Sequence, residues 1–235
     1  MAGADVVVIA EGQTEEQFIK QVVAPALRPL AIYLKPRLLP TSKVAKGGAV
    51  SFDRLKHHAR NTLRESPSTI LSTFLDLQGL RTDFPDFEKA RNIVDVHAHV
   101  ACLEGALHRT IVEAVDCRPE RFLPHIQPFE FEGLLFSDVA ALCAVEPEWG
   151  RFQGKLEKMR AAFESPEHIN GSYDTKPSKR LEDTLSPKYD KTRHGPDAAR
   201  KITLAVMERE CAHFRAWMEK LRRLAGNDSE VRRLG

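Results

Sequence analysis

Residues 6–16 read Val6-Val7-Val8-Ile9-Ala10-Glu11-Gly12-Gln13-Thr14-Glu15-Glu16, an apolar run that ends in a carboxylate and a glycine. A continuous β-branched run of this kind is typical of a strand buried on both faces of a parallel sheet. Glu11 then lies at the carboxyl end of the strand, where open α/β sheets bind their ligands. Taken alone, Glu11 fits equally well as a structural charge at the start of a helix.

A helix is predicted directly after this strand. Gly12 permits a sharp turn, and the spacing of Thr14 and Gln17 fits a capping box, which makes Glu15 the first helical residue. Apolar residues then recur at helical spacing and would face the sheet: Phe18, Ile19, Val22, Val23, Ala26 and Leu27.

Composition places the chain among ordinary globular proteins. It has 235 residues, of which 42% are hydrophobic and 29% are charged, and its net charge of +2 excludes a nucleic-acid binder held by bulk charge. The four cysteines form no C-x-x-C pair, so we expect reduced thiols. The apolar runs are too short for a bilayer and there is no signal-peptide pattern, so we expect a cytoplasmic protein without a membrane partner.

Another strand, later in the chain, is also predicted to end in an acid. Residues 69–76 form an apolar run that finishes on Asp76. Because parallel strands share an orientation, Glu11 and Asp76 can meet at one sheet edge and share a divalent cation. A lone Asp after a strand is also a common helix or turn cap, and only the pair favours a site.

Two more acids lie among large apolar residues. Glu130 and Glu132 alternate with Phe129 and Phe131, which would send both acids to one side of an extended segment; alternatively, Glu132 opens a helix. In either arrangement the charges lie where charge is unusual unless it is used or neutralised.

Two segments are rich in bases. Residues 35–64 carry eight Lys or Arg against the single acid Asp53, and include the loop residues Lys46 and Gly48 and the predicted helical residue Arg54. Residues 165–196 are predicted as a long loop in which Tyr173 and Tyr189 are interleaved with bases, a pattern that suits stacking on nucleobases and contact with phosphates. The structural alternatives are a solvated helix face and a mobile linker. The bases proposed here for nucleic-acid or phosphate binding are Lys46, Arg54, Lys176, Lys179, Arg180 and Lys191.

The remaining elements are predicted from periodicity. A second strand over residues 31–39 is expected to break at Pro36, and helices are expected over residues 87–112 and 197–224. His97 and His99 are two residues apart, so they point in different directions on a helix and do not form a metal pair.

In combination, these residues resemble the Toprim domain of topoisomerases, primases and OLD nucleases, and more closely a bacterial domain-of-unknown-function family with a Toprim-like core. The resemblance covers nearly the whole chain. Its marks are Glu11-Gly12-x-Thr14-Glu15, Asp76-Leu77-x-Gly79-Leu80, Asp83-Phe84-Pro85, Pro124-x-Ile126-Gln127, Glu130-Phe131-Glu132, Pro177-Ser178-Lys179-Arg180, Tyr189-Asp190-Lys191-x-x-His194-Gly195 and Cys211-x-His213-Phe214-x-x-Trp217. The resemblance implies a partner ATPase of the OLD-like, ABC-type class, encoded nearby and often connected with phage defence.

One position departs from the Toprim signature. A second aspartate is usual two residues after the first, and here that position is Gln78. Three explanations remain open: Asp83, Asp86 or the pair Glu130 and Glu132 supplies the missing charge, the site binds metal weakly, or the core binds without cutting.

We therefore predict an α/β Toprim-like domain over residues 1–145, with a parallel sheet flanked by helices, and a mostly helical extension over residues 146–235 packed on it. The favoured function is a Mg²⁺- or Mn²⁺-dependent nuclease for DNA or RNA. The alternatives are a non-catalytic effector or adaptor that binds an OLD/ABC-type ATPase, with or without nucleic acid, and, less favoured, a nucleotide-binding or phosphotransfer role. The sequence also allows a homodimer. The expected catalytic residues are Glu11, Asp76, Glu130, Lys191 and His194, and the expected metal ligands are Glu11, Asp76, Asp83, Glu130 and Glu132.

Overall fold

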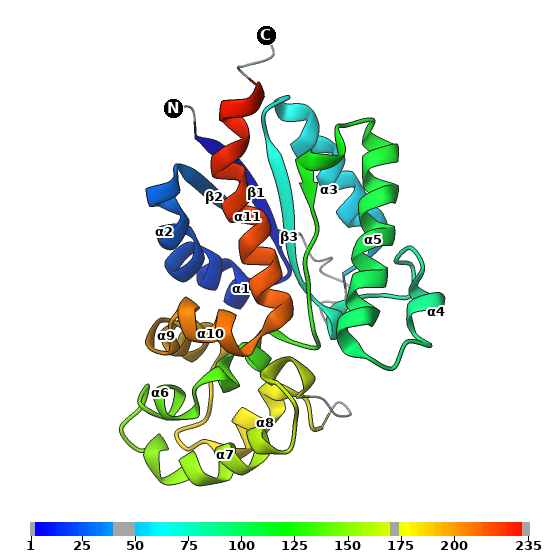
Figure 1. Ribbon diagram of the computed structural model, residues 1–235. Coiled ribbons are helices and arrows are strands. Elements are labelled where there is room, and N and C mark those ends of the chain that lie inside the picture. The colour runs from blue at the N-terminus through cyan, green and yellow to red at the C-terminus, as the bar shows by residue number, and fades with distance from the viewer. Residues whose placement is uncertain (1–2, 40–49, 170–173, 232–235) are drawn as a thin grey trace.

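A parallel β-sheet forms the centre of the computed structural model, which describes residues 3–39, 50–169 and 174–231 (Figure 1). In this described part, the strand order is β2–β1–β3–β4, and β5 pairs with the end of β3. The strands are β1 (Ala4–Ala10), β2 (Ile32–Leu38), β3 (Ile70–Asp76), β4 (Phe122–Leu123) and β5 (Ile126–Gln127). The predicted α/β class with a parallel sheet is confirmed.

The first strand is buried on both faces, as its continuous apolar run predicts. Val6 and Val8 belong to one core cluster, whereas Val7 and Ile9 belong to a second cluster on the opposite face. Since side chains alternate along a strand, this division requires helices on both sides of the sheet.

The second strand continues through Pro36, and the predicted break is wrong. Pro36 lies opposite Val8 in a register that runs from Ala4 and Ile32 to Ala10 and Leu38. The strand tolerates proline because β2 is at the edge of the sheet, where the missing N–H need not serve another strand.

Helices cover both faces of the sheet. On one face lie the helical segment Gln13–Leu27, made of α1 (Gln13–Phe18), a π-helical turn (Ile19–Val23) and α2 (Ala24–Leu27), and the last helix α11 (Ala212–Val231). On the other lie α3 (Phe52–Glu65) and α5 (Val96–Val115) (Figure 1). The predicted helix over residues 87–112 is divided into α4 (Phe87–Ala90) and α5, whose N-cap is Asp95.

The carboxyl-terminal part is mostly helical, as predicted, but its divisions differ. The helices α6 (Val139–Cys143), α7 (Gln153–Ala161), α8 (Pro177–Thr184), α9 (Lys191–Ile202) and α10 (Leu204–Glu210) gather beyond the carboxyl ends of the strands (Figure 1). The predicted loop over residues 165–196 therefore contains α8 and the start of α9. Two residues of this segment begin helices: Pro177 is the first residue of α8, and Asp190 is the N-cap of α9.

The predicted helix over residues 197–224 is also interrupted. Thr203 has a φ of 75° between α9 and α10, and Cys211 has extended backbone before α11. Both breaks let the chain turn back, so that α11 runs along the sheet.

One core cluster contains residues from both sides of the predicted boundary at residue 145, for example Val8, Phe18, Leu156 and Trp217. The division into two parts stays a prediction. All four cysteines are free in the structure, and Cys143 and Cys211 are buried. Among the described helices, none combines the length and the apolar character that crossing a membrane requires.

Candidate functional site

Two strand ends bring the first acids together. Glu11 directly follows β1, and Asp76 is the last residue of the neighbouring strand β3. The backbone N–H of Asp76 donates to Glu11 Oε2 at 3.2 Å. The expected meeting of these two residues at one sheet edge is therefore observed.

Glu130 and Glu132 join them from a later segment. The backbone N–H of Phe131, which lies between the two acids, donates to Asp76 Oδ1 at 2.9 Å. One carboxylate oxygen each from Asp76, Glu130 and Glu132 lie within 4.8 Å of one another. Of the two expected forms, the structure is close to the second: Glu132 lies in the first turn of a helix, which is a 3-10 helix over Phe131–Ser137 that begins one residue before it.

Glu15 is a fifth acid at this site that the sequence interpretation missed. The predicted capping pair is wrong, because α1 begins at Gln13 and the Gly12 N–H donates to Glu15 Oε2 at 2.9 Å. This bond turns the Glu15 side chain back toward the strand end, where it is 7% exposed. The available signal was an acid three residues after a glycine N-cap. Below, "the acidic cluster" means Glu11, Glu15, Asp76, Glu130 and Glu132.

The acidic cluster resists full ionisation. Burial, followed by the charge of Glu15, raises the pKa of Glu11 to about 7. Burial also raises the pKa of Glu132 to about 7 and that of Asp76 well above its usual range, with repulsion from neighbouring carboxylates adding to the shift at Asp76. Desolvation and like charges thus act in the same direction, and both effects oppose the ionisation of these carboxylates.

Two lysines offset part of this charge. Lys191 Nζ lies 3.5 Å from Glu130 Oε1 and 3.3 Å from Glu132 Oε1, and Lys176 Nζ donates to Glu130 Oε1 at 2.8 Å. The Ser178 N–H, at the start of α8, donates to Glu130 Oε2 at 3.0 Å. Despite its burial, these partners lower the pKa of Glu130. The two ammonium groups could balance all five carboxylates only if at least three of these remained protonated.

Gly79 packs directly on the acidic cluster. A Cβ atom at this position would lie 2.3 Å from Glu11 Oε2 and 2.4 Å from Glu11 Oε1. Only a glycine lets the loop after β3 pass this close to the carboxylate.

A protein family described as "Domain of unknown function (DUF4276)" matches residues 10–222. The chain belongs to this family. The match includes every member of the acidic cluster.

Two solved structures are similar to this DUF4276 protein, and both are of the C-terminal region of the Xanthomonas campestris pv. campestris OLD protein. The one phased with iodine is 16% identical, with 96% of this chain and 97% of that chain covered and a TM-score of 0.46. The one phased with mercury is 13% identical, with 95% and 97% covered and a TM-score of 0.44. No curated protein matches the chain.

Asp83 has a structural role in this DUF4276 protein. Its carboxylate accepts from the Phe52 N–H at 3.1 Å and from Ser51 Oγ at 2.9 Å, so it caps the start of α3. Gln78, at the position where the Toprim signature has an aspartate, is exposed and donates its N–H to the Phe129 carbonyl at 3.1 Å.

His194 has partners outside the acidic cluster. Its Nδ1 accepts from the Asp190 N–H at 2.8 Å, and its Nε2 lies 3.2 Å from Glu146 Oε1. The ring is buried and packs edge-on against Trp149. Both ring nitrogens are thus engaged in holding the start of α9, and we do not carry His194 into the proposed chemistry.

The predicted nucleic-acid residues are distributed unevenly. Tyr189 is 3% exposed and belongs to the core, so the expected stacking of its ring on a nucleobase is wrong. Lys176 and Lys191 face the acidic cluster, whereas Lys179 pairs with Asp183 and Arg180 lies over the Phe163 ring. Arg54 lies on α3, half-buried. Lys46, Gly48 and Tyr173 lie outside the described residues.

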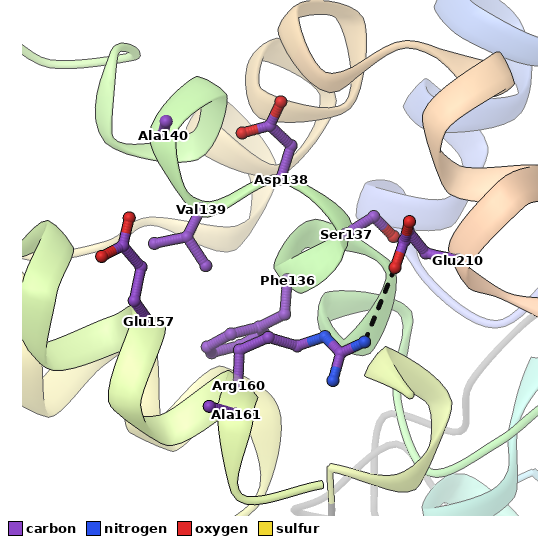
Figure 2. Close-up of a pocket in the computed structure, with 9 residues that line it drawn as sticks. All are labelled: Phe136, Ser137, Asp138, Val139, Ala140, Glu157, Arg160, Ala161 and Glu210. Atoms are coloured by element: carbon purple, nitrogen blue, oxygen red, sulfur yellow. Dashed lines mark ion pairs between the residues drawn. The ribbon is translucent and has the colours of Figure 1, made fainter. Parts of the chain in front are cut away.

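A separate pocket lies between α7 and the end of the 3-10 helix Phe131–Ser137 (Figure 2). Its side chains include Arg160 and Glu210, which form an ion pair at 3.6 Å. No member of the acidic cluster lines this pocket, so we do not assign the candidate site to it.

Proposed function

We propose that this protein is a Mg²⁺- or Mn²⁺-dependent hydrolase of phosphodiester bonds in DNA or RNA. The observation that carries the proposal is the acidic cluster itself: five buried or half-buried carboxylates from separate segments converge at the carboxyl ends of two parallel strands. The donor set consists of oxygens without thiolates or imidazoles, which is the set that these hard cations prefer.

The positions and charges of these carboxylates indicate a role for each of them. Asp76, Glu130 and Glu132 would hold the cation, since their oxygens lie within 4.8 Å of one another. When bound, a divalent cation polarises the phosphate and lowers the pKa of a water. Glu130 has a lowered pKa and stays ionised at neutral pH, so it can supply permanent negative charge.

Glu11 is the proposed general base. Its carboxylate lies beside the proposed ligands, where it accepts from the Asp76 N–H at 3.2 Å, and a bound cation would favour the ionised form that a base needs. It would accept a proton from the water whose oxygen attacks phosphorus, while the bond to the leaving oxygen breaks. Lys191 has a raised pKa and stays protonated, so it would stabilise negative charge on the phosphate and would not donate a proton.

A second candidate is binding without cleavage, as an adaptor for an ATPase. Two observations favour it: Lys191 contacts Glu130 and Glu132 where a cation would otherwise balance them, and Gln78 removes one anionic side chain. An OLD-like, ABC-type ATPase partner is part of both proposals and rests on the motif resemblance.

The test is metal-dependent cleavage of plasmid DNA, single-stranded DNA and RNA, by the protein alone and with its neighbouring ATPase. We expect cleavage with Mn²⁺ or Mg²⁺ that falls at least about 100-fold in Asp76→Asn and Glu132→Gln. Glu88→Gln is the control, because Glu88 is an exposed acid on α4. Activity unchanged in Asp76→Asn would overturn the catalytic proposal, and metal-dependent binding of nucleic acid without cleavage would establish the second candidate.

A further inference from the structure

A second cluster of metal-ligating side chains lies away from the acidic cluster. Glu104 on α5, His125 between β4 and β5, and His213 on α11 each offer a ligand atom, all within 4.8 Å of one another. We call these three residues the histidine cluster. His125 and His213 fall within two motifs, residues 124–127 and 211–217, that the acidic cluster leaves without a role.

The hydrogen bonds orient these ligand atoms toward one another. His213 Nε2 lies 2.8 Å from Glu104 Oε1, and His125 Nδ1 lies 3.7 Å from the same oxygen. The Ile126 N–H also donates to Glu104 Oε1 at 2.8 Å and fixes the carboxylate. Ligands held this way lose little further freedom when they bind an ion.

His125 has the proton arrangement that a metal ligand needs. Its Nε2 lies 3.2 Å from Gln127 Oε1, an acceptor, so the proton is assigned to Nε2 and the lone pair to Nδ1. A ligating histidine ordinarily donates its other N–H to an acceptor in this manner.

We propose that Glu104, His125 and His213 bind a transition-metal ion of the zinc class. Two imidazoles and one carboxylate form a ligand set that zinc accepts in proteins, with a fourth position left for water. Ligand atoms about 2.0–2.1 Å from a tetrahedral zinc lie about 3.3–3.5 Å apart. The separations from Glu104 Oε1 are 2.8 Å to His213 Nε2 and 3.7 Å to His125 Nδ1. An ion would therefore replace the proton between His213 Nε2 and Glu104 and shift the ligand atoms by about half an ångström.

The site has an outlet to solvent. Glu104 lines a surface groove between α5 and α11 together with His108 and Lys220, and the His213 side chain is 12% exposed. Lys220 Nζ lies 3.8 Å from Glu104 Oε2, the second oxygen of this carboxylate. Its side chain is 43% exposed, so it can withdraw into solvent when an ion binds.

The expected consequence is structural. The three ligands come from α5, the β4–β5 connection and α11, so an ion would tie the last helix to the sheet. Binding to the folded state alone raises the melting temperature by mass action.

The test is titration of chelator-treated protein with Co²⁺ and Zn²⁺ in the Asp76→Asn background, which removes a ligand of the acidic cluster. We expect one equivalent of Co²⁺ with visible absorption bands of a four- or five-coordinate site, displacement by Zn²⁺, and a higher melting temperature with Zn²⁺. His213→Ala and Glu104→Gln should each weaken binding at least about 10-fold. His108→Ala is the matched control, because His108 lines the same groove but bonds to the Pro119 carbonyl.

If His213→Ala does not fold, zinc-edge X-ray absorption of the Asp76→Asn protein, without any further substitution, provides the test. Two imidazoles and oxygen ligands are the expected first shell. Absence of stoichiometric binding, binding unchanged in Glu104→Gln, or a first shell without imidazole would each overturn the proposal. Failure of the nuclease test leaves this result unaffected, since the two clusters share no residue.

Discussion

At the scale of single residues, environment decides what each acid of this protein can do. Glu11 and Glu132 have pKa values raised to about 7 by burial, whereas Glu130 is held ionised by Lys191, Lys176 and the Ser178 N–H. These acids are of one chemical type. Their different partners give them different protonation at neutral pH, as in other sites that need both a base and a permanent anion.

Glu11→Gln is expected to raise the melting temperature of metal-free protein at pH 8 and to change it much less at pH 5. The folded protein binds a proton at Glu11 with a pKa of about 7 against 4.5 for the ordinary group, so its stability falls as pH rises through this window. Above pH 7 the penalty reaches on the order of 3 kcal/mol. Thermal unfolding of both proteins at pH 5 and pH 8, with a chelator present, measures the change in melting temperature. Equal changes at the two pH values would contradict the raised pKa of Glu11.

Gly79→Ala is expected to destabilise the protein by about 1–3 kcal/mol and to weaken Mn²⁺ binding, because the added Cβ would overlap the Glu11 carboxylate. Gly154→Ala is the matched control: Gly154 lies in α7, and its Cβ would meet nothing within 4 Å. We expect that change to be neutral or slightly stabilising. Urea unfolding and Mn²⁺ titration compare the two; similar effects from both would refute the packing argument.

At the scale of elements, several acids of the motifs quoted above serve the starts of helices. Asp83 caps α3, and Asp190 caps α9 through the Thr192 and Arg193 N–H groups. Glu15 both caps a helix and belongs to the acidic cluster, because it accepts from the Gly12 N–H while its charge acts on Glu11. Sequence alone could not separate capping from catalysis, because both require an acid next to a turn.

Asp83→Ala tests this separation. We expect a loss of about 1–2 kcal/mol in the free energy of unfolding, since the Phe52 N–H and Ser51 hydroxyl lose their acceptor. Mn²⁺ affinity should be unchanged, unlike in Asp76→Asn. Chemical denaturation and Mn²⁺ titration of the two variants decide the matter, and a drop in affinity in Asp83→Ala would restore Asp83 as a ligand.

At the scale of the whole molecule, α11 joins the carboxyl-terminal part to the sheet. Trp217 Nε1 donates to the Oγ of Ser72, a residue of strand β3, at 2.9 Å. Glu167, completely buried, accepts from the His213 and Phe214 N–H groups at the start of α11, and His97 on α5 lies 3.0 Å away. One carboxylate thereby connects three distant segments.

Glu167→Gln is expected to destabilise the protein by on the order of 2–3 kcal/mol at pH 7, since hydrogen bonds to a charged group are lost or weakened. Burial opposes ionisation, yet the bonds from His97, His213 and Phe214 lower the pKa of Glu167 below 4.5. Its contribution is therefore present above pH 4.5 and disappears as the pH falls through the folded-state pKa. Urea unfolding at pH 7 and in acid shows this difference, and Glu164→Gln, at an exposed neighbour, should show none.

The sequence predicted the elements whose pattern is local. The doubly buried strand β1, the acid at the end of β3 and the helix after Gly12 follow from periodicity and from residue type. Pro36 and the segment 165–196 were misjudged, because proline tolerance depends on a strand's place in the sheet and on whether a helix starts there.

What the sequence determined by itself is the parallel sheet and the presence of Glu11 and Asp76 at its edge, since alternation, run length and strand direction are properties of short segments. Only the tertiary structure decided that Glu15 joins the acidic cluster, that both ring nitrogens of His194 are engaged by Asp190 and Glu146, and that Glu104 meets His213 across 109 residues. The physical reason is that these side chains meet through long-range packing of helices on the sheet, which no local pattern encodes.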